Sequence, residues 1–243
     1  MKLLALETST EACSVALWVD GELRERHEIA PRRHTELVLP WCDELLAEAG
    51  IAKSAIDGVA VGRGPGAFTG VRLAVALAQG MALAWDRPVV AVSTLAALAM
   101  RAPNNEANLL PVLAAIDARM GELYLGWFDP TAEDLVQARG TEWMARPAEP
   151  DFAPGSPSAF VGIGSGFAAD GGRLAQVLDA ALQVVDPQGL PHAADVARLG
   201  AAAWARGEAI AADRLEPAYL RDKVALTLVE QAQARAGRES GGA

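Results

Sequence analysis

Residues 2–29 read KLLALETSTEACSVALWVDGELRERHEI, and this stretch decides the fold. Three runs within it, 2–6, 14–19 and 23–29, alternate or run apolar in the way that extended strands do. Asp20-Gly21, between the second and third runs, is a strong signal for a two-residue hairpin turn. We therefore expect three antiparallel strands at the start of the chain.

The next segments alternate between helix and strand. Residues 33–49 carry apolar side chains at helical spacing and stop at Gly50, while Pro40 either kinks this helix or marks where it properly begins. A short buried strand (56–61), a second, alanine-rich helix (71–85) and another strand (88–92) follow. A strand-hairpin followed by helix, strand, helix and strand is the order of one half of the actin-like ATPase fold.

The second half begins the same pattern again, in a weaker copy. Residues 109–116 and 122–128 form an expected strand pair, and 193–206 is spaced for a packed helix. We therefore predict an α/β chain of the actin-like ATPase (ribonuclease H-like) fold, with two related subdomains built on mixed sheets, the second degenerate. The expected parts are an N-terminal subdomain (1–104), a smaller subdomain (105–231) and a disordered tail (232–243).

Composition excludes several classes of protein. The chain has 243 residues and a formal charge of −10, and no segment clusters the Lys and Arg that independent nucleic-acid binding needs. Cys13 and Cys42 have no partner at metal or redox spacing, which indicates a reducing, cytoplasmic compartment. The N-terminus does not read as a secretory signal, and the apolar stretch 71–85 falls short of a membrane span, so we expect no membrane contact.

The glycine-rich segment 62–70, GRGPGAFTG, leads into the second helix and is a candidate anion-binding turn through Gly64, Gly66 and Thr69. It lacks the Lys of a Walker A loop and does not match the dinucleotide fingerprint. We favour a structural interpretation, in which the glycines allow a tight turn and close approach, Phe68 staples the helix entry and Thr69 caps the helix.

Few side chains suggest bond-making or metal chemistry. None of the three histidines has a His or Cys at i+3 or i+4, and only His192 has an Asp there, Asp195, so we expect no metal site. Glu7 ends the first strand, where actin-like ATPases place a phosphate-binding turn, yet an ordinary turn reads the same way. We can assemble no nucleophile, base and orienting residue by spacing, and predict no catalytic residues.

The two helices of the first half carry the strongest functional signal. Their apolar surface is wider than one sheet can cover, which indicates either that they cover each other or that a protein partner binds. The residues predicted to bind a partner are Leu37, Val38, Trp41, Leu45, Val71, Ala74, Leu77, Ala78 and Met81.

Five segments together resemble the TsaB (YeaZ) family along most of the chain. They are LLALETST (3–10), RRHTELVLP (32–40), GRGPGAFTGVR (62–72), AIDARMGELY (115–124) and PAYLRDK (217–223). The resemblance implies an actin-like fold, dimerisation through the two helices after the first hairpin, and partnership with the catalytic paralogue TsaD and with the ATPase TsaE. Self-association of the isolated chain remains an alternative to the heterodimer.

Compared with TsaD-like enzymes, the chain lacks groups that catalysis requires. Glu11 is followed by Ala12 where the enzymes have an acidic pair, and Val38 stands where a second metal-ligating histidine would follow His34. Their nucleotide-clamping segment is matched only poorly by 162–166, GIGSG.

The resemblance therefore implies a non-catalytic scaffold that binds and stabilises TsaD in forming N6-threonylcarbamoyladenosine next to the tRNA anticodon. ATP and metal are expected in the partner subunits, and tRNA contact only through the complex. The alternative is an ATP-dependent phosphotransferase of the same superfold, suggested by the glycine-rich turn and the ETST turn.

Overall fold

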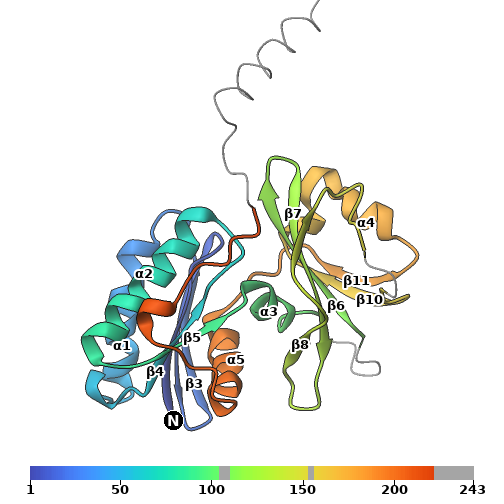
Figure 1. The fold of residues 1–243 in the computed structure, drawn as a ribbon. Coiled ribbons are helices and arrows are strands. Elements are labelled where there is room, and N and C mark those ends of the chain that lie inside the picture. The colour runs from blue at the N-terminus through green and yellow to red at the C-terminus, as the bar shows by residue number, and fades with distance from the viewer. Residues whose placement is uncertain (104–109, 153–155, 222–243) are drawn as a thin grey trace, which may run out of the picture.

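A computed structural model describes residues 1–103, 110–152 and 156–221, which form two lobes, each built on a mixed sheet (Figure 1). The first sheet has the strand order β3-β2-β1-β4-β5. Its strands are β1 (Lys2–Glu7), β2 (Ala12–Val19), β3 (Glu22–Ile29), β4 (Gly58–Gly62) and β5 (Val89–Val92). The pairs β1–β2 and β2–β3 are antiparallel, and β1–β4 and β4–β5 are parallel, which confirms the predicted start of the fold.

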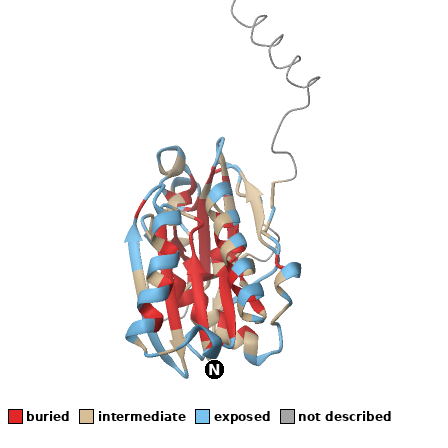
Figure 2. Ribbon diagram, turned by 90° about the vertical axis from the view of Figure 1, so that its left-hand side faces the viewer, coloured by how far each residue is buried: buried red, intermediate tan, exposed pale blue. Residues whose placement is uncertain are grey.

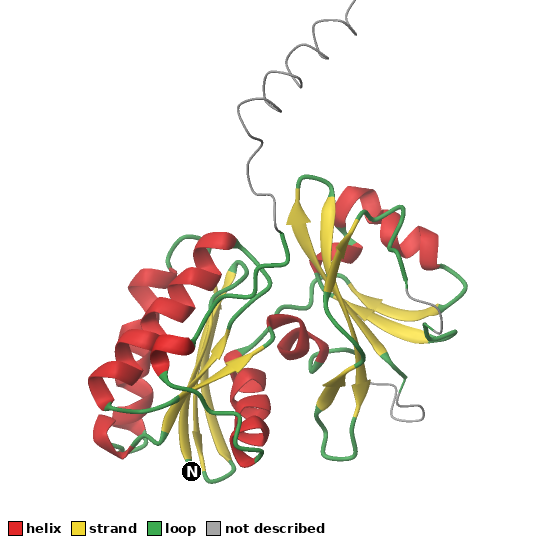
Figure 3. Ribbon diagram, viewed as in Figure 1, coloured by secondary structure: helices red, strands yellow, loops and turns green. Residues whose placement is uncertain are grey.

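Helices cover both faces of the first sheet (Figure 3). They are α1 (His34–Glu48) and α2 (Phe68–Trp85) on one face, and α5 (Ala193–Ala205) on the other. Because side chains alternate along a strand, Leu4 and Leu6 of β1 belong to the core under α1 and α2, whereas Ala5 belongs to the core under α5. α1 runs unbroken through Pro40, so the helix begins six residues before its proline.

Helix α5 comes late in the chain but packs on the first sheet. It contacts β1, β2 and β4, and a Cβ on Gly200 would lie 2.8 Å from the Cβ of Ala60. The prediction that α5 belongs to a subdomain spanning 105–231 is therefore wrong. Small residues on one face of the helix allow it to pack closely on the first sheet, and the order of elements in the sequence does not reveal this contact. The predicted boundary at 104 and the tail 232–243 lie outside the described residues.

The second lobe is a six-stranded sheet in the order β11-β10-β6-β7-β8, with β9 also paired to β7. Its strands are β6 (Val112–Arg119), β7 (Glu122–Pro130), β8 (Val136–Ala138), β9 (Trp143–Ala145), β10 (Phe160–Ile163) and β11 (Leu182–Asp186). β6 and β7 form the predicted antiparallel pair, and β10 is parallel to both β6 and β11.

Short helices complete the structure. Two are α-helices, α3 (Thr94–Ala99), which packs on β6, and α4 (Arg173–Leu178). The others are 3-10 turns, η1 (Lys53–Ala55), η2 (Ser165–Phe167), η3 (Ala169–Gly172) and η4 (Ala212–Arg214). The second sheet is thus covered by shorter helices than the first, consistent with a degenerate copy.

Helix α2 begins at Phe68, three residues earlier than the sequence suggested. At 18 residues it is the one helix in the described part of the chain that is long and apolar enough to cross a membrane, by length and composition alone. Ala74, Ala78 and Ala82 on its inner side are buried in the core of the first lobe, where α2 packs on β4. Its length and apolar character are those of a helix that covers a sheet.

Candidate functional site: two helices and the cleft between the lobes

Most of the residues predicted to bind a partner face the chain's own sheet. Six of the nine are buried in the core of the first lobe: Val38, Leu45, Val71, Ala74, Ala78 and Met81. They cannot contact a partner while the helices stay packed on the sheet, so the prediction is wrong for these six. The remaining three, Leu37, Trp41 and Leu77, are partly buried at the edge of the same core.

An apolar face nevertheless remains outside, on the opposite side of α2. Ala76, Gly80 and Ala84 follow one another at i+4 spacing and are all exposed, and Leu83 beside them is 79% exposed. A Cβ on Gly80 would have no atom within 4 Å. The exposed sides of the helices that cover the sheet face the viewer in Figure 2, with buried strands behind them. Sequence periodicity predicted both helices, but the side of α2 that it assigned to a partner is the buried side.

The glycine-rich turn is filled by the chain itself. A Cβ on Gly66 would lie 2.6 Å from the backbone oxygen of Ser9, and one on Gly70 would lie 2.0 Å from that of Thr8. The N–H of Ala67 donates to the carbonyl of Ser9 (2.7 Å), and the N–H of Gly64 donates to the hydroxyl of Thr94 (3.2 Å). The glycines therefore permit close approach of two loops, as the structural interpretation expected.

The entry of α2 differs from that interpretation in two details. The N-cap residue is Ala67, which has no side-chain cap, and Thr69 lies inside the first turn, so the prediction that Thr69 caps the helix is wrong. Phe68 is 55% exposed and does not staple the helix; the Arg72 guanidinium lies 3.3 Å from the centre of its ring. Phe68 and Arg72 lie about one helical turn apart, and both side chains point to the surface.

Glu7 is a buried structural carboxyl group. Its Oε1 accepts from the N–H of Ser9 (2.7 Å) and its Oε2 accepts from the hydroxyl of Thr94 (3.0 Å). Burial raises the pKa of Glu7, and the hydrogen bonds from Ser9 and Thr94 oppose this only in part. A Cβ on Gly62 would lie 1.9 Å from Oε2, so the carboxyl group fills the space that a side chain would need.

The residues that correspond to TsaD-like metal ligands are occupied otherwise. His34 Nε2 lies 3.1 Å from the carbonyl oxygens of both Thr10 and Ala12. Carbonyl oxygens only accept, so this nitrogen must carry its hydrogen and cannot coordinate a metal in this position. Val38, one turn later, is fully buried in the apolar core. Among the residues that the structure describes, no three His, Cys, Asp or Glu side chains form a group that could hold a metal ion.

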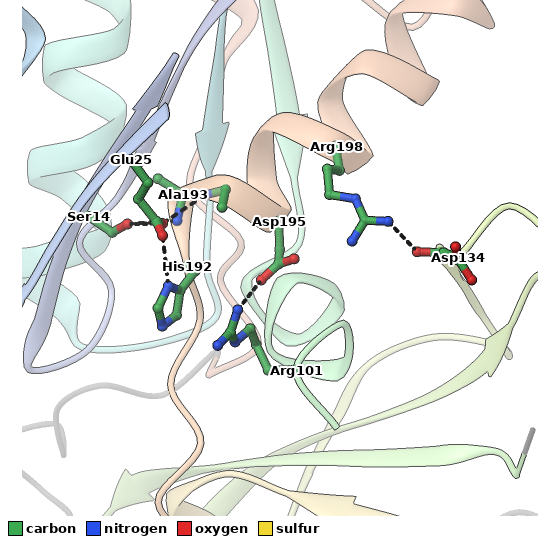
Figure 4. Close-up of polar contacts among 9 residues, drawn as sticks. Ser14, Glu25, Arg101, Asp134, His192, Ala193, Asp195 and Arg198 are labelled. Carbon is green, nitrogen blue, oxygen red and sulfur yellow. Dashed lines mark hydrogen bonds and ion pairs between the residues drawn. The ribbon is translucent and has the colours of Figure 1, made fainter. Parts of the chain in front are cut away.

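A polar cluster that sequence reasoning missed lies where α5 begins (Figure 4). Glu25 Oε1 accepts from the hydroxyl of Ser14 (2.7 Å) and from the N–H of Ala194 (3.0 Å), and the N–H of Ala193 donates to the same Ser14 hydroxyl (2.9 Å). His192 Nδ1 lies 3.1 Å from Glu25 Oε2. The buried Ser14 hydroxyl bonds to a carboxylate and not to a histidine, so the cluster caps a helix and is not a hydrolase triad.

Two polar contacts of α5 lie on its side toward the second lobe (Figure 4). Asp195 Oδ2 is 3.7 Å from Arg101, and Arg198 donates to the carbonyl of Asp134 in the β7–β8 connection (3.0 Å). Burial raises the pKa of Asp195, while Arg101 opposes this. The sequence predicted that Asp195 lies near the start of the helix, but it did not predict that Asp195 lies close to Arg101.

A large cleft separates the lobes near the N-terminus of α2. Its volume is about 1150 Å³, and it is lined by the turn after β1, the glycine-rich turn, the β6–β7 hairpin and residues 218–221. The last segment crosses from one lobe to the other: the N–H of Ala218 donates to the carbonyl of Arg63 (2.8 Å), and Arg221 pairs with Glu122 (2.6 Å). The predicted anion-turn residues Gly64, Gly66 and Thr69 are brought together here, and the latter two line the cleft.

Two lobes, each with a mixed sheet, joined beside a cleft and with helices on both faces of the first sheet, define a protein of the actin-like ATPase fold class. The family model for TsaD, described as tRNA N6-adenosine threonylcarbamoyltransferase, matches residues 27–227. The match to TsaB proteins covers nearly the whole chain, and the chain belongs to the TsaB family.

Two curated relatives and one solved structure carry this assignment. The "tRNA threonylcarbamoyladenosine biosynthesis protein TsaB" of Escherichia coli K12 is 37% identical over 228 residues, 93% of this chain and 96% of that protein. The protein of the same name from Haemophilus influenzae is 38% identical, covering 92% and 95% of the two chains. YeaZ from Pseudomonas aeruginosa is 43% identical with a TM-score of 0.81, covering 90% of this chain and 99% of that one.

Proposed function

We propose that this chain takes part in the biosynthesis of threonylcarbamoyladenosine in tRNA as a non-catalytic subunit that binds and stabilises the transferase TsaD. The observation that carries the proposal is the exposed apolar face of α2, formed by the exposed residues Ala76, Gly80, Leu83 and Ala84 and bordered by the partly buried Leu73 and Leu77. The names of its relatives support a role in this modification, and the match to the TsaD family model supports a paralogous partner.

The shape and apolar character of this face favour packing against another helix over exposure to water. Glycine in the middle of a helix lowers stability by about 1 kcal/mol relative to alanine. In the isolated chain no contact over Gly80 requires a glycine, because the space above it is open. A small residue at this position allows a second helix to approach closely, with Ala76 and Ala84 above and below. Burying Leu83, which is 79% exposed, would contribute about 1–2 kcal/mol to association.

The contacts of the residues expected at a catalytic site support a binding role rather than a catalytic one. Glu7 is buried and bonded to two loops, and His34 Nε2 donates to backbone carbonyls. We therefore assign ATP and metal binding to the partner subunits, with TsaE as a further partner. The exposed face is also self-complementary, so a homodimer of the isolated chain would use the same helix and compete with TsaD.

The setting of this function is the cytoplasm. Cys13 and Cys42 are both free and buried, as expected for a reducing compartment, and the relatives are named as tRNA-modification proteins. The apolar face of α2 is then covered by protein and not by lipid.

Capture of TsaD by variants of this face tests the proposal. Ala76→Arg and Leu83→Glu place a charge on the exposed side, and each should reduce TsaD capture at least about tenfold, because a buried unpaired charge costs well over 1.4 kcal/mol. Val184→Glu is the matched control, since Val184 is 44% exposed on β11 of the other lobe, and it should leave capture unchanged. Ala74→Arg is unsuitable, because Ala74 is fully buried.

Undiminished capture by both α2 variants, with circular dichroism showing intact folds, would refute this interface. A reconstituted modification assay with and without the chain then reports on the function itself. Modification that proceeds equally well without the chain would remove the proposed role.

A further inference from the structure

Four arginines from four separate segments line the cleft between the lobes. They are Arg32, Arg72, Arg119 and Arg221, whereas the described residues of the cleft lining include only two acidic ones, Glu11 and Asp117. Arg32 and Arg72 have no acidic partner among the described residues, and the Arg119 side chain is 85% exposed although it pairs with Asp117. The cleft is therefore locally basic in a chain whose formal charge is −10.

Exposed rings lie among these cations. Phe68 and Tyr219 are 55% and 56% exposed, and both line the cleft. Arg72 lies between them: its guanidinium carbon is 3.3 Å from the ring centre of Phe68 and 5.3 Å from that of Tyr219, and its Nε donates to the Tyr219 hydroxyl (2.9 Å). Exposed rings interleaved with arginine are the groups on which unpaired bases stack.

Part of the floor of the cleft is closed to a triphosphate by hydrogen bonds within the chain. The backbone donors of Ser9, Gly64 and Ala67 bond to Glu7, Thr94 and Ser9 respectively. These three N–H groups are therefore not free for a phosphate, and the turn also lacks the Lys of a Walker A loop. The free charge lies at the rim, and the volume of about 1150 Å³ exceeds the range of about 300–1,000 Å³ usual for a small-molecule site.

We propose that the rim formed by Arg32, Phe68, Arg72, Arg119 and Tyr219 binds a single-stranded segment of RNA, with its phosphates on the arginines and its bases on the two rings. The chemistry of the ligand follows from the cleft, whereas its identity as the loop of the tRNA substrate rests on the proposed function. The site is distinct from the exposed apolar face of α2, whose central residues do not line the cleft. One chain can thus hold the transferase and the RNA at the same time.

Fluorescence anisotropy with the full-length chain and a labelled RNA hairpin of anticodon-arm sequence tests this site. We expect a dissociation constant of about 10⁻⁴ M or tighter at about 50 mM salt, which the strength of phosphate contacts allows. Arg72→Gln with Arg119→Gln should flatten the dependence of log K on log salt by about 1.4, at about 0.7 for each lost single-strand phosphate contact. Phe68→Leu should weaken binding at least about fivefold, the low end for one lost base stack.

Matched controls separate this site from charge in general. Arg139→Gln with Arg206→Gln removes the same charge from residues outside the cleft lining and should leave the salt dependence unchanged. A fully paired duplex of the same length lacks unstacked bases and should bind more weakly than the hairpin. Equal binding of hairpin and duplex, or equal salt dependence for the cleft and control variants, overturns the inference.

Two further outcomes are also decisive. Micromolar binding of Mg-ATP that displaces the hairpin would identify a nucleotide site and overturn the RNA site. TsaD capture by the Arg72 and Arg119 variant should stay at the wild-type level. If the Arg72 and Arg119 variant loses RNA binding but still captures TsaD, the result supports the RNA site in the cleft. If the wild-type chain captures TsaD but does not bind RNA, only this inference is refuted. If the wild-type chain fails to capture TsaD, the proposed function is refuted, and the RNA measurement still tests the cleft.

Discussion

Two glycines of the same helix should respond in opposite ways to the same substitution. Gly70 and Gly80 both lie in α2. A Cβ on Gly80 would meet no atom within 4 Å, whereas one on Gly70 would lie 2.0 Å from the carbonyl oxygen of Thr8 and 3.0 Å from its carbon. Gly80→Ala should therefore stabilise the isolated chain, and Gly70→Ala should destabilise it.

The magnitudes follow from the helix and from the contact. Alanine is favoured over glycine in a helix interior by about 0.8–1.0 kcal/mol, which for a chain of this size raises the Tm by roughly 2–4 °C. At Gly70 the same gain is outweighed, because the Thr8 carbonyl is backbone and its residue is also held by a hydrogen bond from its hydroxyl to the carbonyl of Gly70 (2.7 Å). Overpacking against such a group costs about 3 kcal/mol, so the net loss is about 2 kcal/mol, equivalent to a Tm lower by roughly 4–8 °C.

Urea titration and thermal melts followed by circular dichroism measure both effects, and TsaD capture adds a second readout. If Gly80 faces a partner helix at close range, Gly80→Ala should weaken capture while raising the Tm, which no purely structural role of Gly80 would produce. A lower Tm for Gly80→Ala would show that the outer side of α2 is packed in the isolated chain. A neutral Gly70→Ala would show that the two loops of the first lobe do not meet as described.

Three further predictions concern buried groups and the cleft. Burial raises the pKa of Glu7 above its ordinary 4.5, so the folded chain keeps a proton that the unfolded chain loses, and stability falls as the pH rises through the folded pKa. Glu7→Gln, which can still bond to Ser9 and Thr94, should therefore gain stability relative to the parent chain as the pH rises above 4.5 in urea unfolding; a difference independent of pH contradicts this. Burial raises the thiol pKa of Cys13 and Cys42 to about 12, so neither should react with a thiol reagent at neutral pH until the chain unfolds, and rapid labelling of the native chain would disprove their burial. Calorimetry of the isolated chain with Mg-ATP should show no micromolar binding, because the N–H groups of Gly64 and Ala67 in the glycine-rich turn are engaged within the chain and the turn lacks the Lys of a Walker A loop; such binding would revive the phosphotransferase alternative.

Local pattern was enough to predict the first sheet and its two covering helices. The hairpin at Asp20-Gly21 and the apolar runs around it specify strand pairing through turn chemistry and period-two alternation, both of which act over a few residues. The place of α5 could not be predicted in the same way, because its contacts with β1 and β4 join residues far apart in the chain. Periodicity predicts the apolar stripe of a helix but not how much of that stripe the sheet covers. Ala74 and Ala78, which the sequence placed on a partner-binding surface, are therefore buried against the sheet.

By itself, the sequence determined the fold class and the family, because both depend on patterns and motifs of adjacent or regularly spaced residues. The tertiary structure alone decided which surfaces are free. It buried Val38 and the Ala74 row against the sheet and left Gly80 and Leu83 outside. It also gathered arginines from distant segments around one cleft, in a chain whose formal charge is −10. The physical reason is that electrostatic interactions and apolar contacts depend on the distances between groups in space, and only the packing of the two lobes sets these distances.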